Sequence, residues 1–376
     1  MAPFFVALTD QQALNWHLLV GRTKLKGSLS VALPQTPNSN PVDYIDEEDF
    51  LSLEIPLEMA GERLDKVLAG SLPEYSRNRL KSWVEAGAVM VDGKVTKARY
   101  LLRGGESIKV FPQEMPEQFA FSPENIPLDV VYEDDSIIVI NKPPGLVVHP
   151  AAGNWTGTLL NGLLFRYPEL KTLPRAGIVH RLDKDTSGLM VVARTAQAQT
   201  SLVRQLQERT VGRRYLAWVW GDAPSQGKVL ASVGRDQRDR LRMAAGSPQG
   251  KPAATLYRRL AKGLFQESPV ALLECRLETG RTHQIRVHLE SLGFPLLGDP
   301  VYRKKTPGAA KLLPFERQAL HAFALSLQHP VSSEWMTWFR MPPQDLLDLL
   351  PQVAISAEDL PKEEALLASL QNEHKA

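Results

Sequence analysis

A short charged segment in the middle of the chain combines side chains that can act as acid, base or nucleophile. His180, Arg181 and Asp183 lie close together, and Lys184 follows directly. Asp183 has a cation on each side in the sequence, and nearby cations favour the ionised form of a carboxylate. An ionised carboxylate can act as a nucleophile or as a general base. The composition also fits an ordinary surface turn, because Asp, Ser and Gly are common turn residues.

The residues after this segment predict a buried strand that would hold it in place. Leu189 to Ala193 is an uninterrupted apolar run, and turn-forming residues precede it. A charged loop on a rigid strand is a common way to position catalytic groups. We therefore expect the charged residues on a loop that this strand holds.

A second strand is predicted at residues 213–221. Its alternation places Tyr215, Ala217 and Val219 on one face. A tyrosine on such a face is usually a core residue whose hydroxyl finds a hydrogen-bond partner. From the pattern alone, Tyr215 is therefore interpreted as part of the core.

A third informative stretch predicts a helix that starts after a strand end at residues 279–280. Thr282 is the expected N-cap residue, and Arg286 would lie on the same helix face. His283 and His288 are five positions apart, so they do not form the i, i+4 pair that a helical zinc site needs. No metal site is therefore expected here.

Residues 61–95 predict a small module of two helices and a hairpin. Ser76 is the expected N-cap of the second helix, and Asp92–Gly93 is the expected hairpin turn. The module and the turn after it concentrate cations: Arg63, Lys66, Arg77, Arg79, Lys81, Lys94, Lys97, Arg99 and Arg103. Such a cluster fits phosphate binding, and a solvated helix face explains it equally well if charge is the only observation.

Composition limits the classes of protein that need consideration. The chain has 376 residues, a formal net charge of +2 and one cysteine, Cys275. A single cysteine excludes an intramolecular disulfide and a multi-cysteine zinc site, and its apolar surroundings predict a buried thiol. The global charge does not by itself indicate a nucleic-acid-binding protein. No apolar run approaches the ~18 residues of a membrane span, so we expect a cytoplasmic protein.

Changes in composition predict five segments. Residues 1–56 are expected to be a disordered N-terminal extension, and 57–111 form the basic module. A linker rich in Pro and Glu spans 112–127. The second domain covers 128–352, and 353–376 is a tail that forms either a docked helix or nothing ordered.

Within the second domain the apolar pattern predicts further scaffold elements. The pattern predicts a hairpin at residues 130–140 and a closing strand at residues 335–339. Helices are predicted at 154–167 and 196–208, and Val203 is expected on the inward face of the latter.

Several strings of residues resemble known families. His180-Arg181-Leu182-Asp183, followed by Thr186-Ser187-Gly188-Leu189, resembles the signature of the RluA/RluD-type pseudouridine synthases. Further matches to that family are Asn141–Pro143, Arg213–Tyr215, Thr282–Arg286 and Gly298–Tyr302, although Arg303 stands where Gly is usual. Residues 61–110 resemble an S4 RNA-binding domain.

The resemblance implies an α+β protein in which an S4 domain precedes a catalytic domain with a mixed, largely antiparallel sheet. It implies that Asp183 is catalytic, that Tyr215 stacks on the target uracil and that Arg286 pairs with the aspartate. Arg181 would occupy the space that a flipped base leaves. The other expected RNA contacts are His180, Arg63, Arg77, Arg79, Lys81, Lys94 and Arg281. The family uses no redox cofactor and no metal.

The activity implied by the resemblance is isomerisation of specific uridines in large-subunit (23S) ribosomal RNA, by a monomer with no membrane partner. A duplex hides the base, so the uridine must be flipped out or presented in a loop. A transfer-RNA substrate is the alternative within the family. An alternative from another class is a non-catalytic RNA-binding ribosome-assembly factor. That alternative predicts loss of Asp183, Tyr215 or Arg286, and all three are present.

Overall fold

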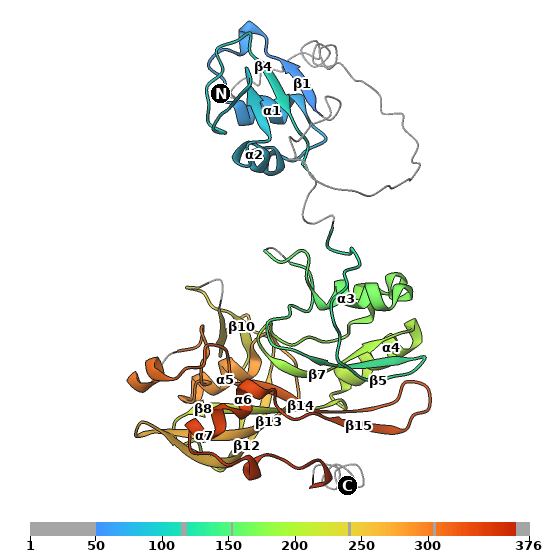
Figure 1. Cartoon of the computed structure of the whole chain (residues 1–376), viewed down its shortest axis with the longest axis vertical. Coiled ribbons are helices and arrows are strands. Elements are labelled where there is room, and N and C mark those ends of the chain that lie inside the picture. Colours follow the sequence, from blue (N-terminus) through green and yellow to red (C-terminus); the bar gives the residue numbers. More distant parts are fainter. Residues whose placement is uncertain (1–49, 114–118, 152, 240–241, 304–305, 366–376) are drawn as a thin grey trace, which may run out of the picture. The chain divides into compact units, whose positions relative to one another are not determined.

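The fold comes from a computed structural model that describes residues 50–113, 119–151, 153–239, 242–303 and 306–365. The chain divides into two compact units, Met1–Met115 and Pro116–Ala376, and each is described by itself (Figure 1). Most of the predicted extension, part of the predicted linker and the end of the predicted tail lie outside the described residues.

The first unit packs two helices against a four-stranded antiparallel sheet with the strand order β1-β4-β2-β3. Its elements are β1 (Leu51–Glu54), η2 (Leu57–Met59), α1 (Leu64–Ser71), α2 (Arg77–Glu85), β2 (Val89–Val91), β3 (Lys94–Val95) and β4 (Ser107–Val110). Apolar side chains from both helices and from β1, β2 and β4 form one core.

Local signals explain most of these elements. Ser76 caps α2 as predicted, because its Oγ accepts the backbone N–H of Arg79 at 3.3 Å. The hairpin turn lies at Asp92 and Gly93, whose φ angles of 47° and 72° suit a two-residue turn. The sheet itself begins at β1, inside the range predicted as an extension. A strand of four residues is too short to give a clear period in the sequence.

The second unit is built on a nine-stranded sheet in which β5-β6-β7-β14-β8-β13-β12-β9 are neighbours and β15 pairs with β14. Its strands are β5 (Val130–Glu133), β6 (Ile137–Lys142), β7 (Ser187–Ala193), β8 (Gly212–Trp220), β9 (Gln226–Leu230), β12 (Ala254–Phe265), β13 (Ser268–Leu277), β14 (Leu320–Gln328) and β15 (Trp335–Phe339). A separate ribbon joins β10 (Val233–Arg235) to β11 (Met243–Ala245). Only the β7–β14 pair is parallel among the described strands, so the prediction of a mixed, largely antiparallel sheet is confirmed.

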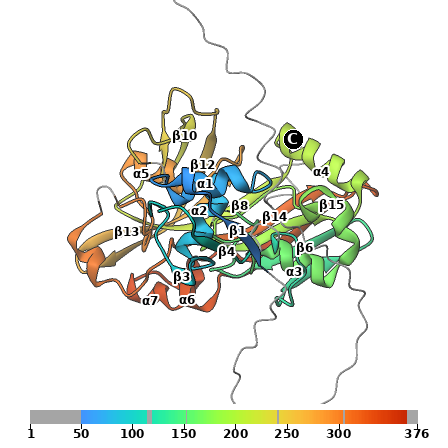
Figure 2. The same cartoon turned by 90° about the horizontal axis from the view of Figure 1, so that it is seen from above.

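Helices cover this sheet, and α4 packs beside β7 (Figures 1 and 2). The helices are α3 (Leu159–Arg166), α4 (Ala196–Glu208), α5 (Gln284–Leu292), α6 (Gln344–Leu347) and α7 (Leu349–Gln352). Short 3-10 turns lie at η4 (Pro168–Thr172), η5 (Pro174–Gly177), η6 (Gly308–Leu312) and η7 (Ala357–Asp359). In the described part of the chain, no helix has the length and apolar character that crossing a bilayer requires.

Two details of the helix predictions were wrong. The helix predicted from residue 154 starts at Leu159, because Thr158 and Asn161 form a capping box there. Val203 was expected to face inward on α4, but it is 37% exposed, whereas Leu202 of the same helix is fully buried. A one-residue step turns a helical side chain by about 100°, so adjacent apolar residues do not both face the core.

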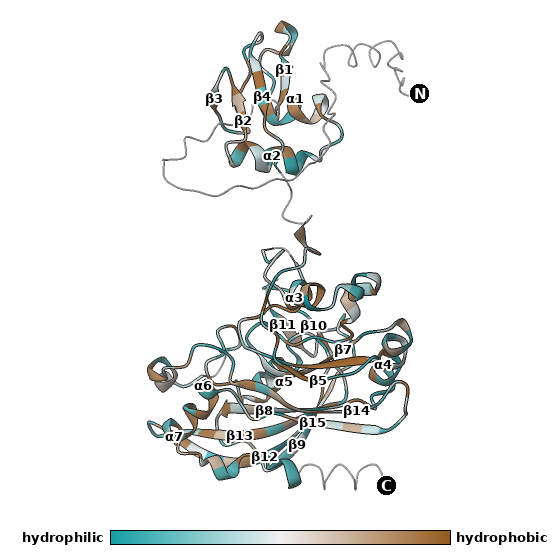
Figure 3. Ribbon diagram, turned by 45° about the vertical axis from the view of Figure 1, so that its right-hand side comes forward, coloured by the Kyte–Doolittle hydropathy of each residue, from teal (hydrophilic) through white to brown (hydrophobic). Residues whose placement is uncertain are grey.

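The central strands β7, β8 and β14 are buried on both faces, and their ribbons are largely hydrophobic in character (Figure 3). Along β8, Tyr215, Ala217 and Val219 belong to one core cluster, and the residues between them belong to another. The predicted facing of these three residues is therefore confirmed. Cys275 on β13 is a buried free thiol, as expected, and burial raises its pKa.

Candidate active site

One cavity of about 850 Å³ gathers the chemistry-bearing residues of the second unit. The loop before β7, the strand β8 and the start of α5 all contribute to its wall. It brings together six of the residues predicted from sequence: Asp183, Tyr215, Arg286, His180, Arg181 and Arg281. Segments far apart in the chain therefore meet at one place.

The carboxylate of Asp183 is held by the guanidinium of Arg286. Nη1 of Arg286 donates to Oδ2 of Asp183 at 3.1 Å, so the expected contact is present. The same guanidinium makes two further bonds to Asp299, from Nε to Oδ2 at 2.7 Å and from Nη2 to Oδ1 at 2.9 Å. Arg286 thus bridges one carboxylate at the cavity and one that is almost completely buried.

Charge and hydrogen bonding keep Arg286 protonated in spite of its burial. Burial lowers its pKa, but the hydrogen bonds and negative charges of Asp299 and Asp183 outweigh that effect and raise the pKa. Asp299 is itself fixed by the backbone N–H groups of Val301 and Tyr302, which donate to its Oδ1 at 2.8 and 2.9 Å. The position of the guanidinium is therefore set by a carboxylate that the backbone anchors.

Tyr302 and His283 complete the surroundings of this ion pair. The Tyr302 ring lies under the Arg286 guanidinium at 4.9 Å, and its hydroxyl hydrogen-bonds Nδ1 of His283 at 2.9 Å. Nε2 of His283 lies 3.9 Å from Oδ1 of Asp183. Burial lowers the pKa of His283, and the charge of Asp183 opposes this shift. Burial also raises the pKa of Tyr302 to about 12, so its hydroxyl stays protonated near neutral pH.

Lys142, at the end of β6, anchors the loop that carries Asp183. Its Nζ donates to the carbonyl oxygens of Pro143, Leu146 and Lys184 at 2.7, 3.0 and 2.8 Å. Burial lowers the pKa of Lys142 to about 7, and the charges of Asp185 and Asp183 oppose the shift. Three carbonyl acceptors require all three N–H bonds of the ammonium, so the loop binds the charged form of this side chain.

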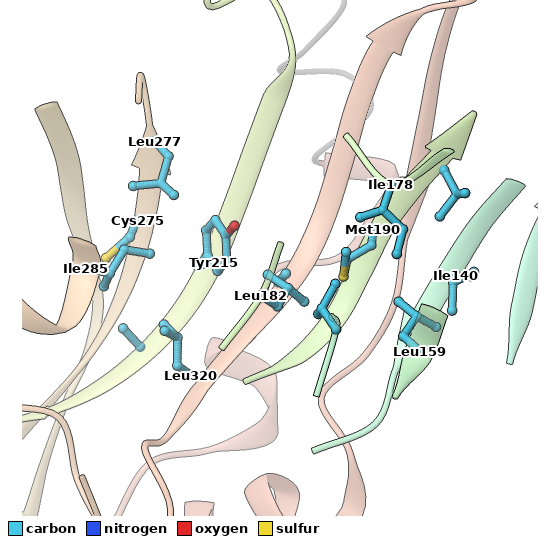
Figure 4. Close-up of a cluster of buried hydrophobic side chains, with 14 of the residues drawn as sticks. Ile140, Leu159, Ile178, Leu182, Met190, Tyr215, Cys275, Leu277, Ile285 and Leu320 are labelled. Atoms are coloured by element: carbon cyan, nitrogen blue, oxygen red, sulfur yellow. The ribbon is translucent and has the colours of Figure 1, made fainter. Parts of the chain in front are cut away.

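Tyr215 lies on β8 among apolar side chains at the cavity. Figure 4 shows its ring beside Leu182 and near Leu320 and Ile285. Burial raises its pKa to about 12, and the nearby charge of Asp183 adds to this effect. Within the described residues its hydroxyl has no hydrogen-bond partner. The hydroxyl oxygen is not enclosed away from solvent, so Tyr215 combines a core position for its ring with access to the cavity.

The remaining cavity residues differ in how they are held. His180 is anchored, because its Nε2 accepts the backbone N–H of Val191 on β7 at 3.0 Å. Arg181 is exposed at the cavity. Arg281 is partly buried and donates from Nε to the carbonyl oxygen of Pro252 at 3.3 Å.

The predicted start of the helix that carries Arg286 was wrong. Thr282 does not cap it; α5 begins at Gln284, and His283 at the N-cap position has a φ of 55°. The side chain of Gln284 organises the turn instead, because its Oε1 accepts from Arg281 N at 3.0 Å and from Thr279 Oγ1 at 2.8 Å. The two histidines of this segment serve separate networks, since His288 hydrogen-bonds Thr255 and Ala231. Among the residues that the structure describes, no cluster of His, Cys, Asp and Glu is suited to hold a metal ion.

The cations predicted to contact RNA in the first unit have unequal surroundings. Arg63 and Arg77 both donate to the carboxylate of Asp65, at 2.9 and 3.1 Å. Arg79 lies over the rings of Tyr75 and Trp83. Lys81 pairs with Glu85 at 3.5 Å, whereas Lys94 is exposed and has no ion pair within the described residues.

Sequence reasoning missed the supporting residues of the site. Asp299 and Tyr302 belong to a string that matches the family, so a signal existed, but their contact with Arg286 did not follow from it. Lys142 also lies in a matching string, but its contacts with the loop that carries Asp183 were not predicted. A lysine or aspartate gives no local sign of which distant group it will bind.

Comparisons with known proteins identify the family of this chain. Residues 136–291 match the family model described as RNA pseudouridylate synthase, and residues 62–108 match the S4 domain. The chain is 50% identical over 359 residues to the ribosomal large subunit pseudouridine synthase D of Neisseria meningitidis serogroup B, covering 91% of this chain and 93% of that protein. The protein of the same description from Nitrosomonas europaea is 49% identical over 320 residues, covering 84% and 92%.

A solved structure shows the same relationship. Human RNA Pseudouridylate Synthase Domain Containing 1 superimposes with a TM-score of 0.51 at 28% sequence identity, covering 66% of this chain and 96% of the human chain. The bacterial relatives are about half identical to this chain over most of its length. The chain therefore belongs to the RNA pseudouridylate synthase family and carries an S4 domain ahead of its catalytic unit.

Proposed function

We propose that this enzyme converts specific uridines of large-subunit ribosomal RNA into pseudouridine, and that Asp183 carries the chemistry. The relatives with about half of their residues identical are described as ribosomal large subunit pseudouridine synthases, and they match this chain over most of its length. The S4 domain adds a module for binding RNA. Such a substrate implies action in the cytoplasm.

The reaction is an isomerisation, so no atom is added or removed overall. The bond between uracil N1 and ribose C1′ breaks, and a bond between uracil C5 and C1′ forms. C5 loses its proton, and N1 gains one. A carboxylate can serve this sequence in two ways: it can attack the ribose carbon or the base as a nucleophile, or it can abstract a proton.

The observation that carries the proposal is the way in which Asp183 is held. In a simple turn the aspartate side chain would accept backbone N–H groups. Here the turn is closed by backbone alone, since Thr186 N donates to the main-chain oxygen of Asp183 at 3.1 Å. Within the described residues the carboxylate is hydrogen-bonded only to Arg286. Its second oxygen therefore remains available at the cavity.

The other two residues would assist in different ways. Arg286 pairs with the carboxylate of Asp183 and fixes its orientation through the bond to Oδ2. Tyr215 offers a flat ring in an apolar wall, and stacking on an aromatic ring is a common way to hold an unstacked base. All three side chains come from one chain, so a monomer suffices.

The experiment is pseudouridine mapping of RNA with the Asp183→Asn variant beside the wild type. Asn keeps the size of Asp but is neither nucleophile nor base, so we expect conversion to disappear while folding and RNA binding persist. Large-subunit ribosomal RNA and transfer RNA are mapped in parallel. Conversion of transfer RNA alone would contradict the proposed substrate, and near-normal conversion by the Asn variant would rule out the catalytic role.

A further inference from the structure

Arg213 on β8 is a buried cation without a partner. The residue is 6% exposed, and its side chain makes no hydrogen bond, ion pair or cation–π contact within the described residues. Its Nε has no contact with solvent either. Burying an unpaired charge is costly, so buried arginines are normally paired. This exception calls for an explanation.

The neighbouring residue shows what normal pairing looks like on the same strand. Nη1 of Arg214 donates to Oε1 of Glu274 at 2.7 Å, and Arg258 donates to the other oxygen of that carboxylate at 2.6 Å. Consecutive side chains on a strand point to opposite faces. β8 therefore presents one paired arginine on the face away from the cavity and one unpaired arginine on the cavity face.

Arg213 shares its face with Tyr215 and lines the same cavity. The cavity wall leaves room for its guanidinium, because Gly280 has no side chain. A Cβ atom at that position would lie 2.7 Å from Nη1 of Arg213. A side chain at position 280 would therefore displace the guanidinium from its present place.

A second unpaired donor belongs to His180, a residue that also lines the cavity. Nε2 of His180 accepts the N–H of Val191, so the neutral ring carries its proton on Nδ1, and that atom has no hydrogen-bond partner and no solvent contact. Burial lowers the pKa of His180 to about 3, and the positive charge of Arg213 adds to the effect.

We propose that Arg213 binds a phosphate group of the RNA next to the uridine that lies on Tyr215. A guanidinium matches the geometry of phosphate with two parallel N–H bonds. A uracil carbonyl is a weaker candidate, because a neutral acceptor leaves the buried charge uncompensated. In the free enzyme the charge is unpaired, and the bound phosphate pairs it. This inference rests on the proposed function, since it needs an RNA substrate in this cavity.

The test compares Arg213→Met and Arg213→Lys with Arg214→Met as the matched control, all in an Asp183→Asn background so that binding is read without conversion. The probe is a single-stranded RNA oligonucleotide from large-subunit ribosomal RNA that contains a uridine mapped as modified. Thermal unfolding without RNA and RNA affinity over a range of salt concentrations are measured for each variant.

We expect Arg213→Met to weaken RNA binding by roughly 10- to 100-fold, as for a charge-assisted hydrogen bond, and to reduce the salt slope by about 1. It should not lower the unfolding temperature, because it removes an unpaired buried charge. Arg213→Lys should keep the salt slope. Arg214→Met should lower the unfolding temperature and leave RNA affinity unchanged. Equal affinity for wild type and Arg213→Met, or destabilisation like that of Arg214→Met, would overturn the proposal.

Neutralising one phosphate at a time identifies the group that Arg213 contacts. A methylphosphonate on the 5′ or the 3′ side of the uridine should weaken binding to the parent protein at one position, and Arg213→Met should be insensitive there. Equal sensitivity of both proteins at every position would refute phosphate binding. These measurements read RNA binding and do not depend on the conversion of uridine. A failure of the catalytic role of Asp183 can therefore be told apart from a failure of phosphate binding by Arg213.

Discussion

Each unit contains a cluster of arginine and aspartate side chains, and the two clusters have opposite ratios of cations to anions. In the first unit Arg63 and Arg77 share the single carboxylate of Asp65. The arginine side chains are 44% and 60% exposed, whereas the aspartate is 6% exposed. Two cations and one anion leave one positive charge, and it lies at the surface.

The catalytic unit reverses this arrangement. One arginine, Arg286, is shared by Asp183 and Asp299, and its side chain is 5% exposed. One cation and two anions leave one negative charge. The more exposed of the two carboxylates is Asp183, which faces the cavity.

The difference shows how ion pairs between arginine and aspartate can serve either the binding of RNA or the chemistry at an active site. A surplus of exposed positive charge attracts phosphates, and water and salt screen it. In the second cluster the shared cation is buried, and the low dielectric around it strengthens its interaction with the carboxylate of Asp183 at the cavity. Variants that change the surplus in either cluster test this contrast.

Removing the shared cation should have the largest effect. In Arg286→Met both carboxylates lose their partner, and Asp299 is left buried and unpaired. We expect the free energy of unfolding to fall by about 3–5 kcal/mol and conversion to be lost. Chemical denaturation and pseudouridine mapping measure the two effects. Arg286→Lys is the control, because it keeps the charge without the planar geometry. If Arg286→Met were as stable as the wild type, Arg286 would not be the shared partner that the two carboxylates need, and the contrast between the clusters would be contradicted.

Removing the charge of the buried carboxylate, Asp299, should lower stability less than Arg286→Met does, and it should affect kcat and not RNA affinity. Asp299→Asn still accepts the backbone N–H groups but no longer holds the guanidinium by charge. We expect a loss of roughly 1.5–3 kcal/mol in stability, as for a charged hydrogen bond. If Asp299 is a positioning residue, kcat falls while RNA affinity stays constant. A change in affinity with constant kcat would contradict this assignment.

The first cluster should respond to acid. Burial raises the pKa of Asp65, but hydrogen bonds from Arg63 and Arg77 outweigh it, and the net pKa is lowered. The ionised carboxylate therefore contributes stability above about pH 4, the usual range for Asp, and that contribution is lost as pH falls through the lowered pKa. The arginines are exposed, so the contribution is about 1 kcal/mol or less.

Asp65→Asn should abolish this acid dependence. Hydrogen exchange of α1 amides between pH 7 and pH 3, corrected for intrinsic rates, measures the local stability. Parallel pH profiles for wild type and variant would show that the two arginines do not stabilise the ionised form.

The smallest effect is expected at Lys94. Lys94→Gln removes an exposed cation without an ion pair in the described residues, so stability should change by no more than about 0.5 kcal/mol. If Lys94 contacts a phosphate, the salt slope of RNA binding falls by about 1. Lys66→Gln is the matched control, because Lys66 pairs with Glu62 at 2.9 Å. Equal slopes for the two variants would remove Lys94 from the RNA contacts.

Local patterns in the sequence were sufficient for much of the fold. The range predicted for α4 matches the structure, and Ser76 and the Asp92–Gly93 turn are where the sequence indicated. These elements depend on neighbouring residues, namely caps, turn formers and apolar spacing. The start of α5 was not predictable in this way, because Gln284 organises it through contacts with residues on another element.

By itself the sequence determined the family of this protein, and the strings around Asp183, Tyr215 and Arg286 predict which side chains carry its chemistry. Only the tertiary structure decided how these groups are held. Arg286 is 103 positions from Asp183 in the chain, and the paired strands and the start of α5 bring them within 3.1 Å. Tertiary packing also made Asp299 the second partner of Arg286 and left Arg213 unpaired. The physical reason is range: caps and turns form between neighbours in the chain, whereas ion pairs form between whichever groups the packed sheet brings together.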